Sequence, residues 1–175
     1  KGYDANVWQQ LCQELGLVGI HISEDQGGAG FGAVELGIVM EEFGRSLMSA
    51  PYFASAVLAT TAIAEIASPG QRDKWLPDLL SGKKIAALAI SEASGEFSLE
   101  GMHTDATVKN GQSVLNGSKH FVVDGQNADM LIVAANDEHG AGLYLADSSV
   151  AGVNLQPSVT MDTTRKLTEI QFSNV

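Results

Sequence analysis

A glycine-rich loop is the first feature of this sequence that could bind a ligand. Gly27-Gly28-Ala29-Gly30 precedes an expected helix, and such a loop can cradle a phosphate group. No Lys-Ser or Lys-Thr pair follows, as a P-loop requires, and no parallel strand-helix-strand pattern surrounds it, as a dinucleotide fold requires. We therefore interpret the loop as a tight turn between packed segments.

The other reactive side chains predict neither a metal site nor an activated nucleophile. The four histidines have no metal-ligand spacing to one another or to Cys12: His21, His103, His120 and His139. Cys12 lies within an expected helix and is interpreted as a small buried side chain. The neighbouring carboxylates at 24–25 and 41–42 point in different directions on a helix, which favours solvated surface. The residues alone predict no catalytic group.

Composition excludes several classes of protein. The net charge of −11 disfavours DNA or RNA as a partner. The single cysteine rules out an intrachain disulfide and is consistent with a reducing compartment, so we expect a cytoplasmic protein. No apolar run approaches the ~20 residues of a membrane span, and no signal peptide is visible.

Apolar residues recur at helical spacing in the first half of the chain. This spacing predicts helices over residues 4–15, 33–43 and 51–67. A fourth helix is expected to follow Ser68-Pro69-Gly70-Gln71, which has the pattern of a capping box, and to end at Gly82. Trp8 and Trp75 occupy apolar helical positions and are predicted to lie in the core.

The second half has the pattern of short strands and turns. Asn110-Gly111 is the strongest hairpin signal, and Asn116-Gly117 is interpreted as a second turn. Strands are expected at 85–91, 104–109, 112–115, 119–123, 130–135, 142–146, 153–156 and 167–172. The sequence thus predicts an α+β protein, with an N-terminal helical domain at 1–84 followed by a small antiparallel β-barrel or sandwich domain at 85–175.

An ordered set of motifs spans nearly the whole chain. The stretches are LGLVGI at 15–20, SEDQGGAG at 23–30, VMEEFGR at 39–45, QRDKWLP at 71–77, ALAISE at 87–92 and NGSKHFVVDG at 116–125. Each is similar to a motif of the acyl-CoA dehydrogenase family, in the family's order. The chain resembles the N-terminal helical domain, incomplete at its start, and the middle β domain of that family, without the C-terminal helical domain.

The resemblance implies a flavoprotein that catalyses α,β-dehydrogenation of an acyl-CoA thioester, with FAD as hydride acceptor. It further implies electron-transfer flavoprotein as the electron acceptor and a homo- or hetero-oligomeric assembly. The family's catalytic glutamate belongs to the C-terminal domain, so no residue here is named as catalytic and the chain by itself is expected to be inactive.

The resemblance also implies a set of cofactor-binding residues. Leu88, Ile90 and Ser91 fall on the segment that borders the flavin ring in the family. Phe121, Val122 and Val123 occupy the positions of the family's Trp-Ile-Thr, which packs against the ring.

Three departures leave alternatives open. Residues 91–97 lack the family's proline and form a shorter loop, Phe121 replaces the family's Trp, and Val123 has no hydroxyl. Residues 161–165 also replace a glycine-rich segment. One alternative is a degenerate, non-catalytic subunit of a mixed acyl-CoA dehydrogenase complex. Independently of these departures, an acyl-CoA oxidase or flavin monooxygenase of the same fold is a further alternative, because no motif in this chain separates it from a dehydrogenase.

Overall fold

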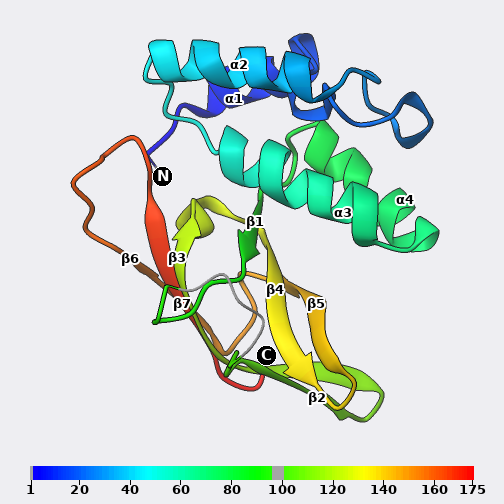
Figure 1. Cartoon of the computed structure of the whole chain (residues 1–175), viewed down its shortest axis with the longest axis vertical. Coiled ribbons are helices and arrows are strands. Elements are labelled where there is room, and N and C mark those ends of the chain that lie inside the picture. Colours follow the sequence, from blue (N-terminus) through cyan, green and yellow to red (C-terminus); the bar gives the residue numbers. More distant parts are fainter. Residues whose placement is uncertain (1, 96–100) are drawn as a thin grey trace. The chain divides into compact units, whose positions relative to one another are not determined.

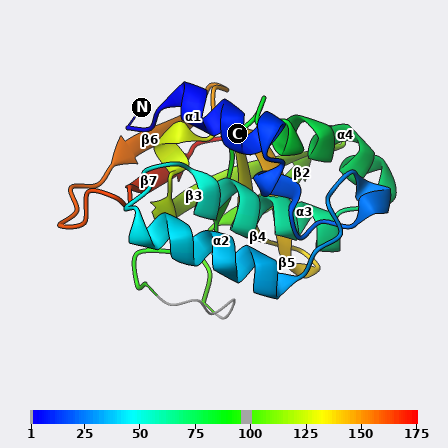
Figure 2. The same ribbon diagram turned by 90° about the horizontal axis from the view of Figure 1, so that it is seen from above.

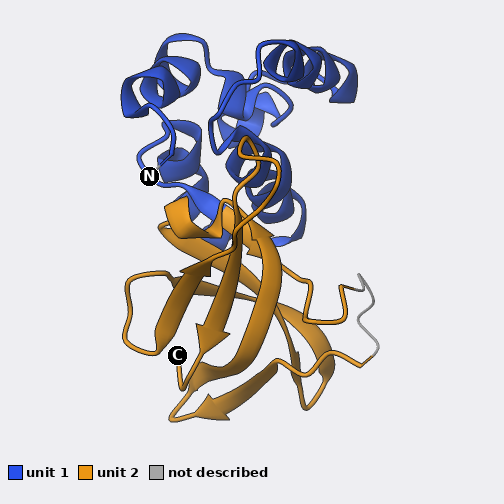
Figure 3. Ribbon diagram, turned by 90° about the vertical axis from the view of Figure 1, so that its left-hand side faces the viewer, with its two compact units in different colours: residues 1–86 blue, residues 87–175 orange. Residues whose placement is uncertain are grey.

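The computed structural model describes every residue except 1 and 96–100. Its contacts divide the chain into two compact units, Lys1–Ala86 and Ala87–Val175 (Figure 3). The first unit is helical and the second is a curled, mixed β sheet. This arrangement confirms the predicted α+β class, with helices first and strands second.

The helices of the first unit overlap the segments predicted from apolar spacing and from the capping-box pattern. They are α1 (Ala5–Gln9), α2 (Ala33–Arg45), α3 (Thr61–Ile66) and α4 (Pro69–Leu80). Wider π-helical turns at Gln10–Glu14 and Phe53–Thr60 extend α1 and precede α3. Short 3-10 turns lie at Leu17–Gly19 and Glu24–Gln26. The sequence pattern predicts the helices but not these wider turns.

Polar side chains and a glycine define the ends of these helices. The Asp4 carboxylate accepts hydrogen bonds from the backbone N–H groups of Asn6 and Val7, at 2.8 and 3.2 Å. At the start of α4, Gln71 Oε1 accepts from the Ser68 backbone N–H at 2.9 Å, which is the glutamine contact of a capping box. Gly16, with φ of +63°, follows the first helix. These contacts satisfy backbone groups that a helix end leaves without partners.

The core of the first unit forms around two aromatic side chains. Trp8 is buried as predicted, and its Nε1 donates to the Gly82 carbonyl at 3.2 Å. Tyr52 donates its hydroxyl to the Leu17 carbonyl at 2.8 Å, and the Phe43 ring packs edge-on against it. These rings pack with Leu11, Cys12, Val18, Ala56 and Ile85.

Trp75 does not lie in the core, so that prediction is wrong. The residue is only partly buried, and the Lys74 ammonium lies 5.0 Å from its ring centroid. Helix α4 instead buries Leu76 and Leu79. Because side chains one position apart point about 100° from one another, burying Leu76 and Leu79 turns the adjacent Trp75 toward the edge of the buried face.

Helix α2 forms one side of the helical unit (Figure 2) and carries apolar residues on two faces. Leu36, Val39, Met40 and Phe43 pack against the core. Val34 and Ile38, one turn apart, are 72% and 56% exposed. The helix therefore presents an uncovered apolar stripe.

The described residues of the second unit form a seven-stranded sheet. Its strands are β1 (Ala86–Ala89), β2 (Asp105–Lys109), β3 (Gln112–Val123), β4 (Met130–Asp137), β5 (Gly140–Asp147), β6 (Val153–Pro157) and β7 (Leu167–Phe172). The order is β1-β4-β2-β3-β7-β6, with β5 on β4 (Figure 1). Pairs β2–β3, β3–β7, β4–β5 and β6–β7 are antiparallel, whereas β2 and β4 meet at one parallel pair, Asp105 with Asn136.

The two Asn-Gly pairs behave differently. Asn110 and Gly111 both have positive φ, at +54° and +78°, and form the predicted hairpin between β2 and β3. The predicted turn at Asn116-Gly117 is wrong, because β3 runs through it. A Cβ on Gly117 would lie 2.7 Å from Thr104 Cα. The glycine therefore permits close backbone approach rather than reversal of the chain.

The core of the second unit lies on the inner face of this sheet. Ala87 and Ala89 of β1 point into it together with Leu131 and Val133 of β4. Its other members include Ala106, Leu115, Val122, Ile170 and Phe172. After β1, Ile90 and Ser91 run beside β3, where their carbonyls accept hydrogen bonds from Lys119 Nζ and from the His120 backbone N–H.

Candidate functional site on the bulge of strand β3

Strand β3 contains a β-bulge near its end. Lys119 pairs with Ile170 of β7 and Val122 pairs with Thr168, so two residues of β3 lie opposite the single residue Glu169. Phe121, one of the two, has φ of +57°. Positive φ is uncommon for a bulky residue, and a bulge redirects the side chains around it.

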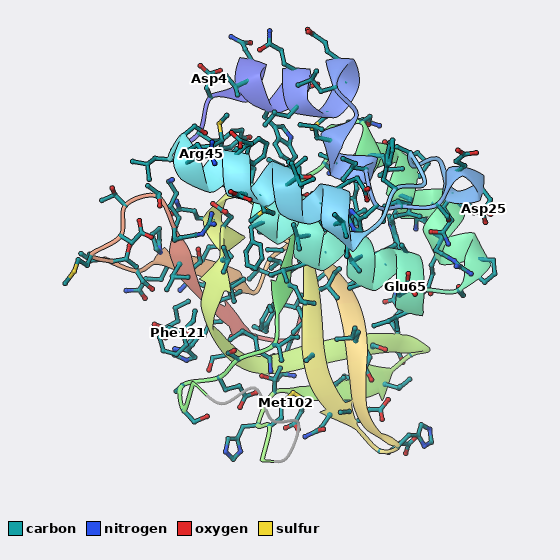
Figure 4. The ribbon with its side chains drawn as sticks, turned by 45° about the horizontal axis from the view of Figure 1, so that its top comes forward. Asp4, Asp25, Arg45, Glu65, Met102 and Phe121 are labelled. Carbon is teal, nitrogen blue, oxygen red and sulfur yellow. The ribbon has the colours of Figure 1, made fainter. Side chains whose placement is uncertain are left out.

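The bulge directs the phenyl ring of Phe121 into solvent. The residue is 52% exposed, and Figure 4 shows it at the outer side of the sheet. Its ring centroid lies 6.1 Å from that of His120, and a Cβ built on Gly95 would lie 3.8 Å from Phe121 Cε2. Phe121 is therefore not part of the barrel core. An exposed aromatic ring on strained backbone is typical of a binding surface.

The end of β1 lies directly beside the bulge. The Ser91 carbonyl accepts a hydrogen bond from the His120 backbone N–H at 2.8 Å. Ser91 is 7% exposed, while Leu88 and Ile90 are half-buried on the strand positions that alternate with the core alanines. The structure thus brings Ser91 next to the segment that carries Phe121. Glu96 and Phe97 of the shortened loop lie outside the described residues.

The two valines after Phe121 differ in their surroundings. The side chain of Val122 is 2% exposed and belongs to the hydrophobic core. Val123 is half-buried and pairs with Leu167 of β7. At Val122 only the backbone remains for contact with a ligand outside the sheet.

A buried ion pair lies between the end of β1 and β3. Lys119 Nζ lies 2.9 Å from Glu92 Oε1, and the lysine side chain is fully buried. Burial opposes ionisation of the Glu92 carboxyl, but hydrogen bonds from Thr104, His103 and Lys119 outweigh it and lower its pKa to about 2. Burial likewise lowers the pKa of Lys119, and the Glu92 carboxylate opposes that effect. The Glu92 carboxyl is therefore ionised at physiological pH and accepts a hydrogen bond from Lys119 Nζ.

Sequence reasoning did not single out this ion pair, although a signal for it exists. Leu115 and Lys119 lie four positions apart in one strand, so both side chains point to the same face. Since Leu115 is buried, the period-two pattern predicts burial of Lys119. The assumed turn at Asn116-Gly117 hid this signal because it divided the strand.

The glycine-rich loop of the first unit is a tight turn, as predicted. The backbone N–H groups of Gly28, Ala29 and Gly30 donate to the carbonyls of Ser23, Gly19 and Ile22, at 2.8–3.0 Å. Amides engaged in this way are not available to a phosphate group.

Other reactive groups of the described residues form no second site. Cys12 is buried, and that burial raises the pKa of its thiol to about 12. Within residues 2–95 and 101–175, no group of three His, Cys, Asp or Glu side chains could hold a metal ion. Over the same residues, no helix is long and apolar enough to cross a membrane.

Comparison with known proteins places both units in one family. The family model described as acyl-CoA dehydrogenase, N-terminal domain, matches residues 1–83. The model described as acyl-CoA dehydrogenase, middle domain, matches residues 87–175. The chain belongs to the acyl-CoA dehydrogenase family. The matched ranges follow the two units of the structure.

Individual relatives and solved structures are similar to this chain. Mitochondrial isovaleryl-CoA dehydrogenase of Pongo abelii is 35% identical over 136 residues, which are 77% of this chain and 32% of that protein. Butyryl-CoA dehydrogenase from Megasphaera elsdenii matches with a TM-score of 0.86 and 26% identity, over 99% of this chain and 48% of that one. A chain of the ChsE4–ChsE5 complex from Mycobacterium tuberculosis matches with a TM-score of 0.87 and 26% identity, over 99% and 46%. This member of the acyl-CoA dehydrogenase family spans about a third of the length of that curated relative.

Proposed function

We propose that the whole protein is an FAD-dependent acyl-CoA dehydrogenase and that this chain supplies the surface that holds one side of the flavin ring. Family membership supports the activity. The observation that carries the site is the exposed ring of Phe121 on the β3 bulge, beside the end of β1.

The residues at the bulge fit a flat, partly polar ring. Phe121 offers an apolar aromatic face, for a stacking gain of about 0.5–1.5 kcal/mol beyond burial. Leu88 and Ile90 add half-buried apolar surface. Ser91 carries a hydroxyl at the edge of this surface, where a hydrogen bond contributes about 1 kcal/mol. Val123 has no side-chain donor, so its backbone N–H takes that role in this proposal.

The chain's own residues bind and orient the cofactor in this proposal. Bound FAD supplies the hydride acceptor for α,β-dehydrogenation of an acyl-CoA thioester. Phe121 and Ile90 shield one face of the ring from water, and Ser91 fixes its edge. No residue of this chain is assigned as the catalytic base, so we expect the chain by itself to be inactive.

The proposed partners follow from the family. The substrate is an acyl-CoA, and the electron acceptor is electron-transfer flavoprotein. We propose an oligomeric assembly, and similarity to a chain of the ChsE4–ChsE5 complex supports one built from unlike subunits.

The test is a titration of the full-length protein with FAD. We expect Phe121→Ala to weaken FAD binding about three- to tenfold and Ser91→Ala about fivefold. Phe31→Ala and Ser113→Ala remove the same groups from exposed positions elsewhere and are expected to bind like wild type. If both site variants bind FAD as tightly as wild type while remaining folded, the site assignment is wrong.

A degenerate subunit that binds no flavin is the second candidate. The missing hydroxyl at Val123 and the buried side chain of Val122 favour it, because each removes a side-chain contact with the ring. This candidate keeps the fold and packs against an active partner. Failure of the folded wild-type protein to bind FAD would support it and would contradict our first proposal.

A further inference from the structure

We propose that the buried Glu92–Lys119 pair is the positioning device of the flavin-facing site, holding Ser91 and Phe121 in fixed relation. The inference rests on the function proposed above. Neither side chain of the pair is assigned contact with the ring.

The Lys119 ammonium donates hydrogen bonds to the residues on both sides of Ser91. Its Nζ donates to the Ile90 carbonyl at 3.0 Å and to Glu92 Oε1 at 2.9 Å. The next residue of β3, His120, donates its backbone N–H to the Ser91 carbonyl at 2.8 Å. Three consecutive residues, 90–92, are therefore tied to two consecutive residues of β3.

The Glu92 carboxylate fixes the pair to a third segment. Its Oε1 accepts from the Thr104 backbone N–H at 2.9 Å and from the Thr104 hydroxyl at 2.7 Å. Its Oε2 accepts from the His103 backbone N–H at 2.8 Å. Thr104 is fully buried, and its Cα is the atom that a side chain at Gly117 would strike. The carboxylate thus joins the end of β1 to the segment before β2.

The same stretch of β3 carries the clamp and the ring. Lys119 is the last residue in register with β7 before the bulge, and Phe121 stands two positions later, inside it. A change in the position of Lys119 therefore moves Phe121 and Ser91 together. Charge-assisted hydrogen bonds restrict such movement more than apolar contacts do, because they are short and directional.

Stability alone is a weak reason for this arrangement. The free energy needed to desolvate two charges offsets much of the free energy gained from their attraction. Replacing a buried ion pair by apolar residues is therefore often neutral or stabilising. A merely structural pair could then be replaced without loss at the site. If the pair positions Ser91 and Phe121, its apolar replacement should impair flavin binding even when stability is kept. The effect on flavin binding therefore distinguishes the two roles.

The experiment compares single and paired substitutions in the full-length protein with FAD. Lys119→Met leaves the Glu92 carboxylate without its cation, and Glu92→Gln removes the charge while keeping an oxygen acceptor for Thr104. The readouts are melting temperature, FAD affinity, visible circular dichroism of the bound flavin and its midpoint potential. Tyr144→Phe, which removes a 2.6 Å hydrogen bond to Asp137 in the same unit, is the control for a general loss of stability.

We expect each single variant to lower the melting temperature and to weaken FAD binding about tenfold. The double variant should recover most of the melting temperature, while FAD affinity, dichroism and potential stay altered. Tyr144→Phe should leave the three flavin readouts unchanged. Recovery of all readouts in the double variant would show that the pair is only structural and would overturn the inference.

Two further outcomes separate this inference from the proposed function. If wild type binds FAD and Phe121→Ala weakens binding, but the pair variants bind normally, only the positioning role fails. If folded wild type binds no FAD, both fail. Should the single variants not fold, Thr104→Val removes one donor to Glu92 at nearly constant volume, and unchanged flavin readouts in that variant would also overturn the inference.

Discussion

At the scale of single residues, Glu92 couples protonation to the fold of the second unit. Burial opposes its ionisation, but donors from Thr104, His103 and Lys119 lower its pKa from the ordinary 4.5 to about 2. A carboxyl whose pKa is lower in the folded state stabilises the fold above its unfolded pKa. That stabilisation is lost as the pH falls toward the folded value.

We therefore expect the second unit to lose stability as the pH falls from about 4.5 to about 2. Hydrogen exchange of the β3 amides, followed by mass spectrometry across this range, measures the change. Glu92→Gln should flatten the dependence because glutamine does not titrate. Glu138→Gln, at an exposed hairpin position, should leave it as in wild type. Equal slopes for wild type and Glu92→Gln would contradict the coupling.

At the scale of elements, the end of α4 depends on the absence of a side chain at Gly82. This glycine has φ of +69°, and a Cβ there would lie 2.8 Å from Cys12 Cβ and 3.1 Å from Trp8 Nε1. Its carbonyl also accepts hydrogen bonds from the side chains of Trp8 and Gln9. The residue thus closes α4 directly against the core of the first unit.

Gly82→Ala is expected to destabilise the first unit by about 2–4 kcal/mol, through backbone strain and overpacking. Gly37→Ala is the matched control, since Gly37 lies inside α2 and, apart from the neighbouring backbone of that helix, no atom lies within 4 Å of an added Cβ. That change should stabilise by about 0.5–1 kcal/mol because alanine favours the helix. Urea unfolding followed by the fluorescence of Trp8 and Trp75, which both belong to the first unit, measures both changes. A neutral Gly82→Ala would show that the segment relaxes freely.

Local signals predicted these elements where neighbours in sequence decide the conformation. Apolar spacing indicated three helices and a capping-box pattern the fourth. Asn110-Gly111 indicated its hairpin, since both positions adopt the positive φ that such a turn needs. The same dipeptide at Asn116-Gly117 led to a wrong prediction, because Gly117 is needed for the close approach of Thr104 from another segment and not for a turn. A dipeptide alone does not distinguish the two uses.

At the scale of the whole molecule, the order of helices and strands could be predicted from the sequence, but the candidate site could be predicted only in part. Ser91 and Phe121 were singled out through family motifs, and the structure brings their segments together. The bulge that exposes Phe121 depends on how β3 pairs with β7, some 50 residues later. The Glu92–Lys119 pair depends on three segments meeting. Such long-range register is not encoded in local composition.

Each unit encloses its own hydrophobic core. Local opening of the second unit would therefore expose Lys119, which is buried in that unit, to reagents in solution. The core around Trp8 belongs to the first unit and that around Leu131 to the second. An amine reacts with acylating reagents only when it is accessible and unprotonated. Lys119 is fully buried and paired with Glu92, whereas the side chain of Lys83 is 70% exposed.

Lys119 is thus a chemical reporter of opening events. We expect a water-soluble acylating reagent to modify Lys83 quickly and Lys119 at the rate at which β3 opens, as read by mass spectrometry over time. FAD bound at the β3 bulge of the full-length protein should slow modification of Lys119 without changing that of Lys83. A ligand that binds only the closed state suppresses opening. Equal labelling rates for the two lysines would contradict this. The extent of acylation at Lys119 then measures how often strand β3 separates from the sheet.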